Sequence, residues 1–140
     1  MKLQTASAVI SLSKELETAS AGFYEALAEK FAEGKESFLA YAKENRKYIV
    51  QTERSYYSVI SDALEGCYSF NLDSDDYALD TAVPASYADA VKAAIKNDET
   101  VVKFYSEAAQ QSESLMADVP RTFKMIAKKK LARIDTLKSL

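Results

Sequence analysis

Four segments of the sequence carry apolar residues at helical spacing, and each has a polar side chain within its apolar stripe. Glu17 lies seven residues from both Ile10 and Tyr24, which places it on their side of a helix. Asp98 lies seven residues before Tyr105 and has the same relation to its own stripe. Because an unpaired buried charge costs several kcal/mol, this pattern predicts a polar site inside a helical bundle. The other positions of this kind, on or beside the stripes, are Asn45, Tyr48, Lys130 and Arg133.

The formal charges of these residues cancel. Glu17 and Asp98 are negative, whereas Lys130 and Arg133 are positive. One interpretation is a neutral network of ion pairs and hydrogen bonds that fixes the register of the helices. The other is a polar site that binds a ligand or takes part in chemistry. Tyr48 either joins this network or is an ordinary amphipathic tyrosine.

The composition excludes several kinds of chemistry. The chain has 140 residues, no histidine and one cysteine, Cys67. It therefore has no imidazole metal ligand, no histidine general base and no internal disulfide. A formal net charge of −3 is too small to imply a polyanionic partner, although residues 121–140 carry seven basic residues against Asp135. We expect a cytoplasmic protein without a signal peptide or membrane span.

The apolar periodicity predicts an all-α protein, a four-helix bundle of two antiparallel hairpins in one domain over 1–140. Gly34 is expected to end the first helix, Ser86 to cap the third and Pro120 to stand just before the fourth. Both short links favour hairpins, whereas the polar connection 65–85 is long enough to cross the bundle. The predicted helices cover about 7–33, 36–64, 86–112 and 121–138.

The two halves of the chain resemble each other. Phe23-Tyr24 recurs as Phe104-Tyr105 after 81 residues, and Phe38 recurs as Phe123 after 85. With Glu17 and Asp98, these residues make the chain resemble the ferritin-like superfamily, specifically its rubrerythrin-like branch, over roughly residues 7–60 and 86–138. Ala42-Lys43-Glu44 and its counterpart Ala127-Lys128-Lys129 belong to the same resemblance.

The resemblance implies a di-iron site, with one Glu from each of helices one and three and a Glu-x-x-His pair from each of helices two and four. In this chain Glu17 keeps the first ligand position, and Asp98 stands at the third-helix position. The two pairs fall on Asn45 with Tyr48 and on Lys130 with Arg133, so the metal ligands are largely replaced. Glu44 directly precedes a ligand position and is expected to point about 100° away from it.

The sequence favours a non-catalytic ferritin-like protein without a cofactor, which acts as a structural or protein-interaction module. By analogy with the family we expect a homodimer, with an unidentified protein partner possible. A second hypothesis is a metal-binding or redox protein that uses Glu17, Asp98 and a carboxylate such as Glu44 or Glu53 in altered coordination. A third is a small anion held by Lys130 and Arg133.

Three other motifs are weaker. The acidic run from Asp73 lacks the Gly and Glu of an EF-hand calcium loop. Lys128-Lys129-Lys130 points in three directions around a helix, so we expect no nucleic-acid partner. Cys67 lies in acidic surroundings that disfavour a thiolate, and one cysteine cannot build the rubredoxin-like domain common in rubrerythrins.

Overall fold

The computed structural model describes residues 1–59, 70–113 and 118–140, and over these ranges the chain is mostly helical. The prediction of an all-α protein is confirmed, with the addition of a very small two-stranded sheet. In the described ranges there are four long helices: α1 (Ala6–Lys30), α2 (Lys35–Val59), α4 (Tyr87–Ser112) and α5 (Asp118–Lys138).

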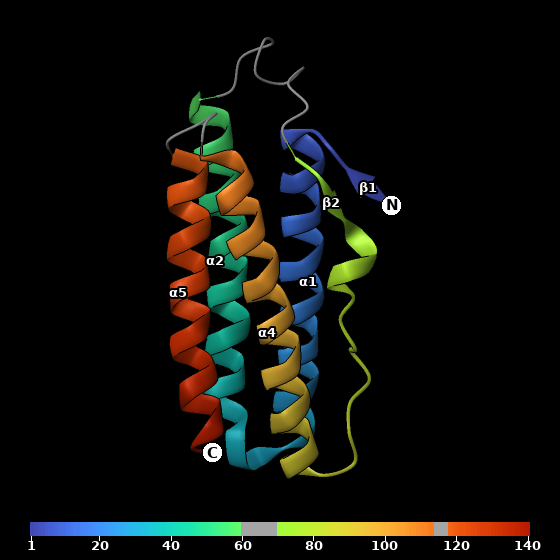
Figure 1. Cartoon of the computed structure of the whole chain (residues 1–140). Helices are drawn as coiled ribbons and strands as arrows, with labels where there is room; N and C mark the ends of the chain where they lie inside the picture. The colour runs from blue at the N-terminus through green and yellow to red at the C-terminus, as the bar shows by residue number, and fades with distance from the viewer. Residues whose placement is uncertain (60–69, 114–117) are drawn as a thin grey trace.

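The four helices lie side by side along one axis (Figure 1). Helix α1 packs against α2, which returns in the opposite direction after the short 3-10 helix η1 (Ala32–Gly34). Helix α4 packs against α5, which also runs antiparallel to it. Helix α5 also packs against α2, and α4 against α1, so that the four helices enclose one interior. No helix in the described ranges is long and apolar enough to cross a membrane.

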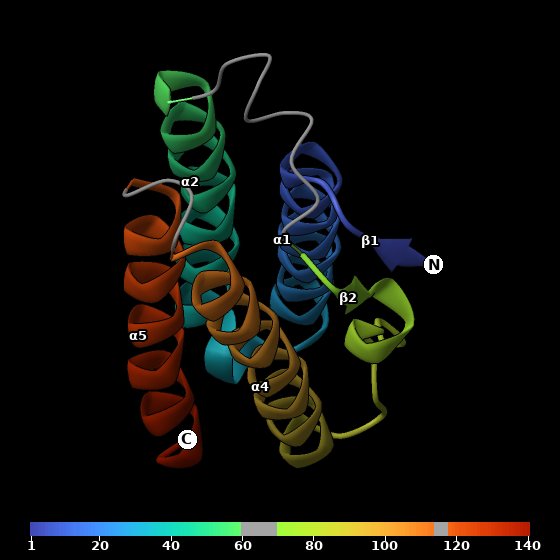
Figure 2. The ribbon, with the colours of Figure 1, turned by 45° about the horizontal axis from the view of Figure 1, so that its top comes forward.

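The link between α2 and α4 is more structured than the polar connection that we predicted. Strand β2 (Leu72–Asp73) pairs antiparallel with β1 (Lys2–Leu3), with Leu3 opposite Leu72. The 3-10 helix η2 (Ser74–Tyr77) follows, and the chain then runs beside α1 to the start of α4 (Figures 1 and 2). Four side chains of this layer are buried: Leu3, Phe70, Leu72 and Tyr77. The predicted end of the second helix at 64 and Cys67 lie outside the described residues.

The helix ends follow local side-chain chemistry. Ser86 caps α4 as predicted, since its hydroxyl accepts a hydrogen bond of 3.1 Å from the backbone N–H of Asp89. Thr5 caps α1 in the same way, at 3.2 Å from the N–H of Ala8. Pro120 is the third residue of α5, so this helix starts before the predicted residue 121. Proline is tolerated there because the first-turn N–H groups have no partner within the helix.

The prediction that Gly34 ends the first helix is wrong. Helix α1 ends at Lys30, because Phe31 adopts an extended conformation with φ −117° and ψ 108°. Gly34 ends η1 instead, and its φ is not positive. A Cβ at this position would lie 2.7 Å from a ring carbon of Phe38. Gly34 is therefore needed for a close approach to an aromatic ring rather than for a left-handed turn.

The apolar core consists of two clusters, one at each end of the bundle. One contains Leu16, Phe104 and Phe123, and the other contains Leu27, Phe38 and Leu137. Along every helix, the buried polar residues singled out above come between residues of the first cluster and residues of the second. A polar layer thus crosses the middle of the bundle.

Candidate functional site

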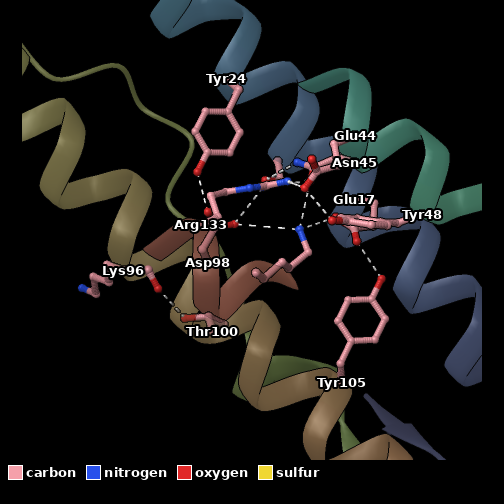
Figure 3. Close-up of polar contacts among 12 residues, drawn as sticks. Glu17, Tyr24, Glu44, Asn45, Tyr48, Lys96, Asp98, Thr100, Tyr105 and Arg133 are labelled. Carbon is pink, nitrogen blue, oxygen red and sulfur yellow. Dashed lines mark hydrogen bonds and ion pairs between the residues drawn. The ribbon is translucent and has the colours of Figure 1, made fainter. Parts of the chain in front are cut away.

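The polar layer brings together all six candidate residues. Figure 3 labels all of them except Lys130. Glu17 comes from α1, Asn45 and Tyr48 from α2, and Asp98 from α4. Lys130 and Arg133 come from α5. Glu17, Asn45, Asp98 and Lys130 are 0% exposed, and Arg133 is 4% exposed. At such burial each charge needs a partner, and the contacts described below provide one.

Lys130 is the centre of the layer. Its Nζ lies 2.8 Å from Glu17 Oε1 and 3.9 Å from Asp98 Oδ1. It also donates a hydrogen bond of 3.0 Å to Asn45 Oδ1 and lies 5.2 Å from the centre of the Tyr48 ring. One ammonium group on α5 therefore contacts side chains from each of the other three helices.

Arg133 extends the layer toward the surface. Its Nη1 donates to Asn45 Oδ1 at 2.9 Å and lies 3.5 Å from Asp98 Oδ1. The guanidinium carbon lies 4.7 Å from the centre of the Tyr41 ring and 5.5 Å from that of Tyr24. Burial favours the neutral guanidine, but the interactions with Asp98, Tyr24 and Glu44 together outweigh it and raise the pKa of Arg133 above its ordinary value. Arg133 is thus a permanent cation held between aromatic faces and carboxylates.

Two buried tyrosines connect α1 and α4 in opposite directions. Tyr24 on α1 donates a hydrogen bond to Asp98 Oδ2 on α4. Tyr105 on α4 donates to Glu17 Oε2 on α1 at 2.8 Å and also contacts the Ser13 hydroxyl at 2.9 Å. Burial, together with the neighbouring carboxylate, raises the pKa of both phenols well above 10. Both tyrosines therefore stay protonated and act as donors.

Asn45 holds the cations from the side of α2. Its Oδ1 accepts from both Lys130 and Arg133, while its Nδ2 donates to Ser20 on α1 at 2.9 Å. An amide can fill this place because it is neutral and offers an acceptor on one side and a donor on the other. A glutamate here would add a negative charge to a group of buried charges that is already neutral.

Glu44 reaches the layer, although helical geometry turns it about 100° away from the position of Asn45. Its side chain is 43% exposed, but Oε1 lies 2.9 Å from Arg133 Nη2 and accepts a hydrogen bond of 2.5 Å from Tyr48. The two residues meet because both side chains are long enough to reach each other from different directions on α2 and α5. Partial burial favours the protonated carboxyl, but the hydrogen bonds from Tyr48 and Arg133 outweigh it and lower the pKa of Glu44.

The structure does not bring Glu53 to this layer. Its side chain instead forms an exposed ion pair of 3.8 Å with Lys14.

Sequence reasoning missed several members of the network. Tyr24 and Tyr105 could have been found, since each lies seven residues after a carboxylate that we had placed on its stripe. The remaining missed members are Ser13, Ser20 and Tyr41.

The residues of the layer do not fit a metal ion. Lys130 Nζ occupies the edge of Glu17 that a metal would need, and both Lys130 and Arg133 face Asp98 Oδ1. In the described ranges no group of three or more Asp, Glu, Cys or His side chains could hold a metal ion. Each cation is already paired with at least one carboxylate, which leaves little positive charge for the small anion of our third hypothesis. Chemically, the arrangement fixes charges and protons in place.

No protein-family model, curated protein or solved structure matches the chain.

Proposed function

We propose that this chain is a non-catalytic protein of the ferritin-like, rubrerythrin-like type, in which protein cations take the place of two metal ions. It then acts as a structural or protein-interaction module. The observation that carries this proposal is the position of Lys130 Nζ, 2.8 Å from Glu17 Oε1 and 3.9 Å from Asp98 Oδ1. Those carboxylates stand at the two ligand positions that the resemblance assigns to the first and third long helices.

The order of the elements supports the same proposal. Helices α1 and α2 form one pair, and α4 and α5 form another. The connection between the pairs returns along the bundle (Figure 2). The reciprocal bonds from Tyr24 to Asp98 and from Tyr105 to Glu17 join equivalent positions of the two halves. Ferritin-like bundles with one long crossover have this general organisation.

The direct test is metal loading. Purified protein is incubated with ferrous iron or with manganese, desalted and analysed for metal. We expect far less than one ion per chain, since a di-metal site would retain about two. Retention of two ions would contradict the proposal. It would favour the alternative of a metal-binding or redox protein, to which Glu44 would contribute as a third carboxylate beside the buried pair.

Restoring the ligands tests the family relation itself. The combined variant Asn45→Glu, Tyr48→His, Asp98→Glu, Lys130→Glu and Arg133→His rebuilds the ligand set that the resemblance implies. We expect this variant to bind iron. A matched control, Lys128→Glu with Leu131→His, creates the same Glu-x-x-His spacing on the exposed side of α5 and should not bind iron tightly. A folded restored variant without iron would argue against the ferritin-like relation.

The homodimer and the cytoplasmic location stay predictions. Sedimentation equilibrium of the purified chain checks the first, and localisation of a tagged chain checks the second. Both outcomes are independent of metal content.

A further inference from the structure

The charges of the chain are strongly separated between its helices. Helices α2 and α5 together carry twelve basic and five acidic residues, a net charge of +7. The rest of the chain carries −10, because the whole has −3. Of the twelve basic residues only Lys130 and Arg133 are buried, so ten are exposed on these two helices.

Helices α2 and α5 lie next to each other (Figures 1 and 2). A hollow of about 370 Å³ opens between them near the start of α5. Gln51, Arg54 and Ser55 line it from α2, and the lining residues from α5 are Asp118, Arg121, Thr122 and Met125. The hollow thus combines two guanidinium groups with uncharged polar groups, one thioether and the carboxylate of Asp118, which pairs with Arg121.

From helical spacing we infer that a groove continues from this hollow along the bundle. Lys47 lies seven residues before Arg54, and Lys129 lies seven residues after Thr122, so each continues a row that lines the hollow. Both lysines are exposed. At the far end of the groove Glu44 meets Arg133, so the one carboxylate there is already neutralised.

These cations are available to a partner. Over the described residues Lys47, Arg54 and Lys129 form no ion pair. Arg121 pairs with Asp118 at 3.4 Å, and both side chains are well exposed. An exposed pair of this kind contributes about 0–1 kcal/mol, so an incoming carboxylate can compete for the guanidinium. We refer to Lys47, Arg54, Arg121 and Lys129 as the basic groove.

We propose that the basic groove binds an acidic, amphipathic segment of a protein partner. This inference names a partner for the interaction module proposed above, and it rests on the proposed function in that respect alone. Carboxylates would pair with the four cations, and arginine offers them bidentate hydrogen bonds. Apolar side chains of the segment would pack on the thioether of Met125, which lines the hollow.

This mixture of groups favours a protein over a nucleic acid. A nucleic acid offers one phosphate per nucleotide and no aliphatic side chain for Met125. The net charge of −10 outside α2 and α5 would also repel a long polyanion that extends past the groove. A second copy would have to offer acidic residues such as Asp75 and Asp76 of η2, an element that lies beside α1 on another side of the bundle (Figure 2). Such head-to-tail contacts form open chains unless they close into a ring.

The test is peptide binding to the full chain. The probe is a fluorescein-labelled peptide of repeated Glu-Glu-Leu triplets, followed by fluorescence anisotropy at physiological salt. The groove variant combines Lys47→Gln, Arg54→Gln, Arg121→Gln and Lys129→Gln. The control variant combines Lys2→Gln, Lys14→Gln, Lys92→Gln and Lys96→Gln, which removes the same number of charges from other parts of the chain.

We expect the groove variant to bind the probe at least about tenfold more weakly than the unchanged chain, and the control variant to change the Kd less than about twofold. Equal losses in both variants, or no binding by the unchanged chain, would overturn the proposal. Tighter binding of a single-stranded DNA oligonucleotide of equal charge would overturn it in favour of a nucleic acid. Self-association that the groove variant abolishes would overturn it in favour of a second copy.

Metal analysis of the same preparations keeps this inference separate from the proposed function. A metal-free chain that does not bind the peptide contradicts only the partner. A chain that binds the peptide but retains two metal ions contradicts only the proposed loss of the metal site.

Discussion

Tyr105 on α4 donates a hydrogen bond of 2.8 Å to Glu17 on α1, and its counterpart in the first half of the chain does the reverse. Tyr24 on α1 donates to Asp98 on α4. Each tyrosine and its counterpart are 81 residues apart, as are the two carboxylates. The internal repeat therefore produces a reciprocal pair of contacts between α1 and α4.

The reciprocal bonds predict similar losses from two distant substitutions. Tyr24→Phe and Tyr105→Phe each remove a donor from a fully buried carboxylate, and each should lower the free energy of unfolding by about 1–3 kcal/mol. Urea unfolding followed by circular dichroism measures this loss. Tyr57→Phe is the control, because Tyr57 is 69% exposed and its change should have little effect. A loss in only one of the two buried variants would contradict the equivalence of the two bonds.

Lys130 should be the most costly single residue of the layer to change. Lys130→Met keeps the apolar stem but leaves Glu17 without its cation, and we expect a loss of about 3–5 kcal/mol of unfolding free energy. Adding Glu17→Gln should recover part of this loss, because the unpaired charge is then gone. Thermal and urea unfolding of both variants check this. Stability unchanged in Lys130→Met would show that the ammonium does not balance the buried carboxylates.

These two predictions also indicate what the sequence could and could not provide. The inward position of Glu17, Asn45, Asp98 and Lys130 follows from helical spacing, because their stripes are regular and their neighbours are apolar. The ion pair of Glu44 with Arg133 did not follow from spacing, because spacing describes where a Cβ points, whereas these two residues meet through long flexible side chains. Strands β1 and β2 have two residues each, too few to produce a periodic pattern. Gly34 was misread because a close ring contact leaves no trace in the local sequence.

Acidification should weaken the fold partly through Glu44. The pKa of Glu44 is lowered in the folded chain from an ordinary value of 4.5, so the folded state favours the charged carboxylate. The stabilisation that Glu44 contributes to the folded state is fully present at pH values above the ordinary pKa. It is lost as the pH falls through the lower pKa of the folded state. Urea unfolding between neutral pH and the acid limit of the folded state measures the decline.

Glu44→Gln measures how much of the loss of stability on acidification is due to the Glu44 carboxyl. The variant should be less stable than the unchanged chain at neutral pH, and the difference should shrink on acidification. Glu25→Gln is a suitable control, because Glu25 forms an exposed ion pair with Arg46 and touches no member of the buried layer. A gap between Glu44→Gln and the unchanged chain that stays constant with pH would contradict the assignment.

The two described glycines should respond in opposite ways to the same substitution. In Gly34→Ala the new Cβ would lie 2.7 Å and 2.8 Å from two ring carbons of Phe38 and 3.1 Å from one of Tyr87. These rings are packed in the core, so we expect a loss of about 1–3 kcal/mol from overpacking. Gly22 lies in the interior of α1, and a Cβ there meets no atom within 4 Å. Gly22→Ala should therefore raise stability by about 0.5–1 kcal/mol, because alanine loses less backbone entropy in a helix.

Paired thermal unfolding of the two variants decides between the interpretations of Gly34. Equal gains would restore the view that Gly34 is only a link between helices, whereas a loss confined to Gly34→Ala supports its role in bringing the start of α2 against the ring of Tyr87.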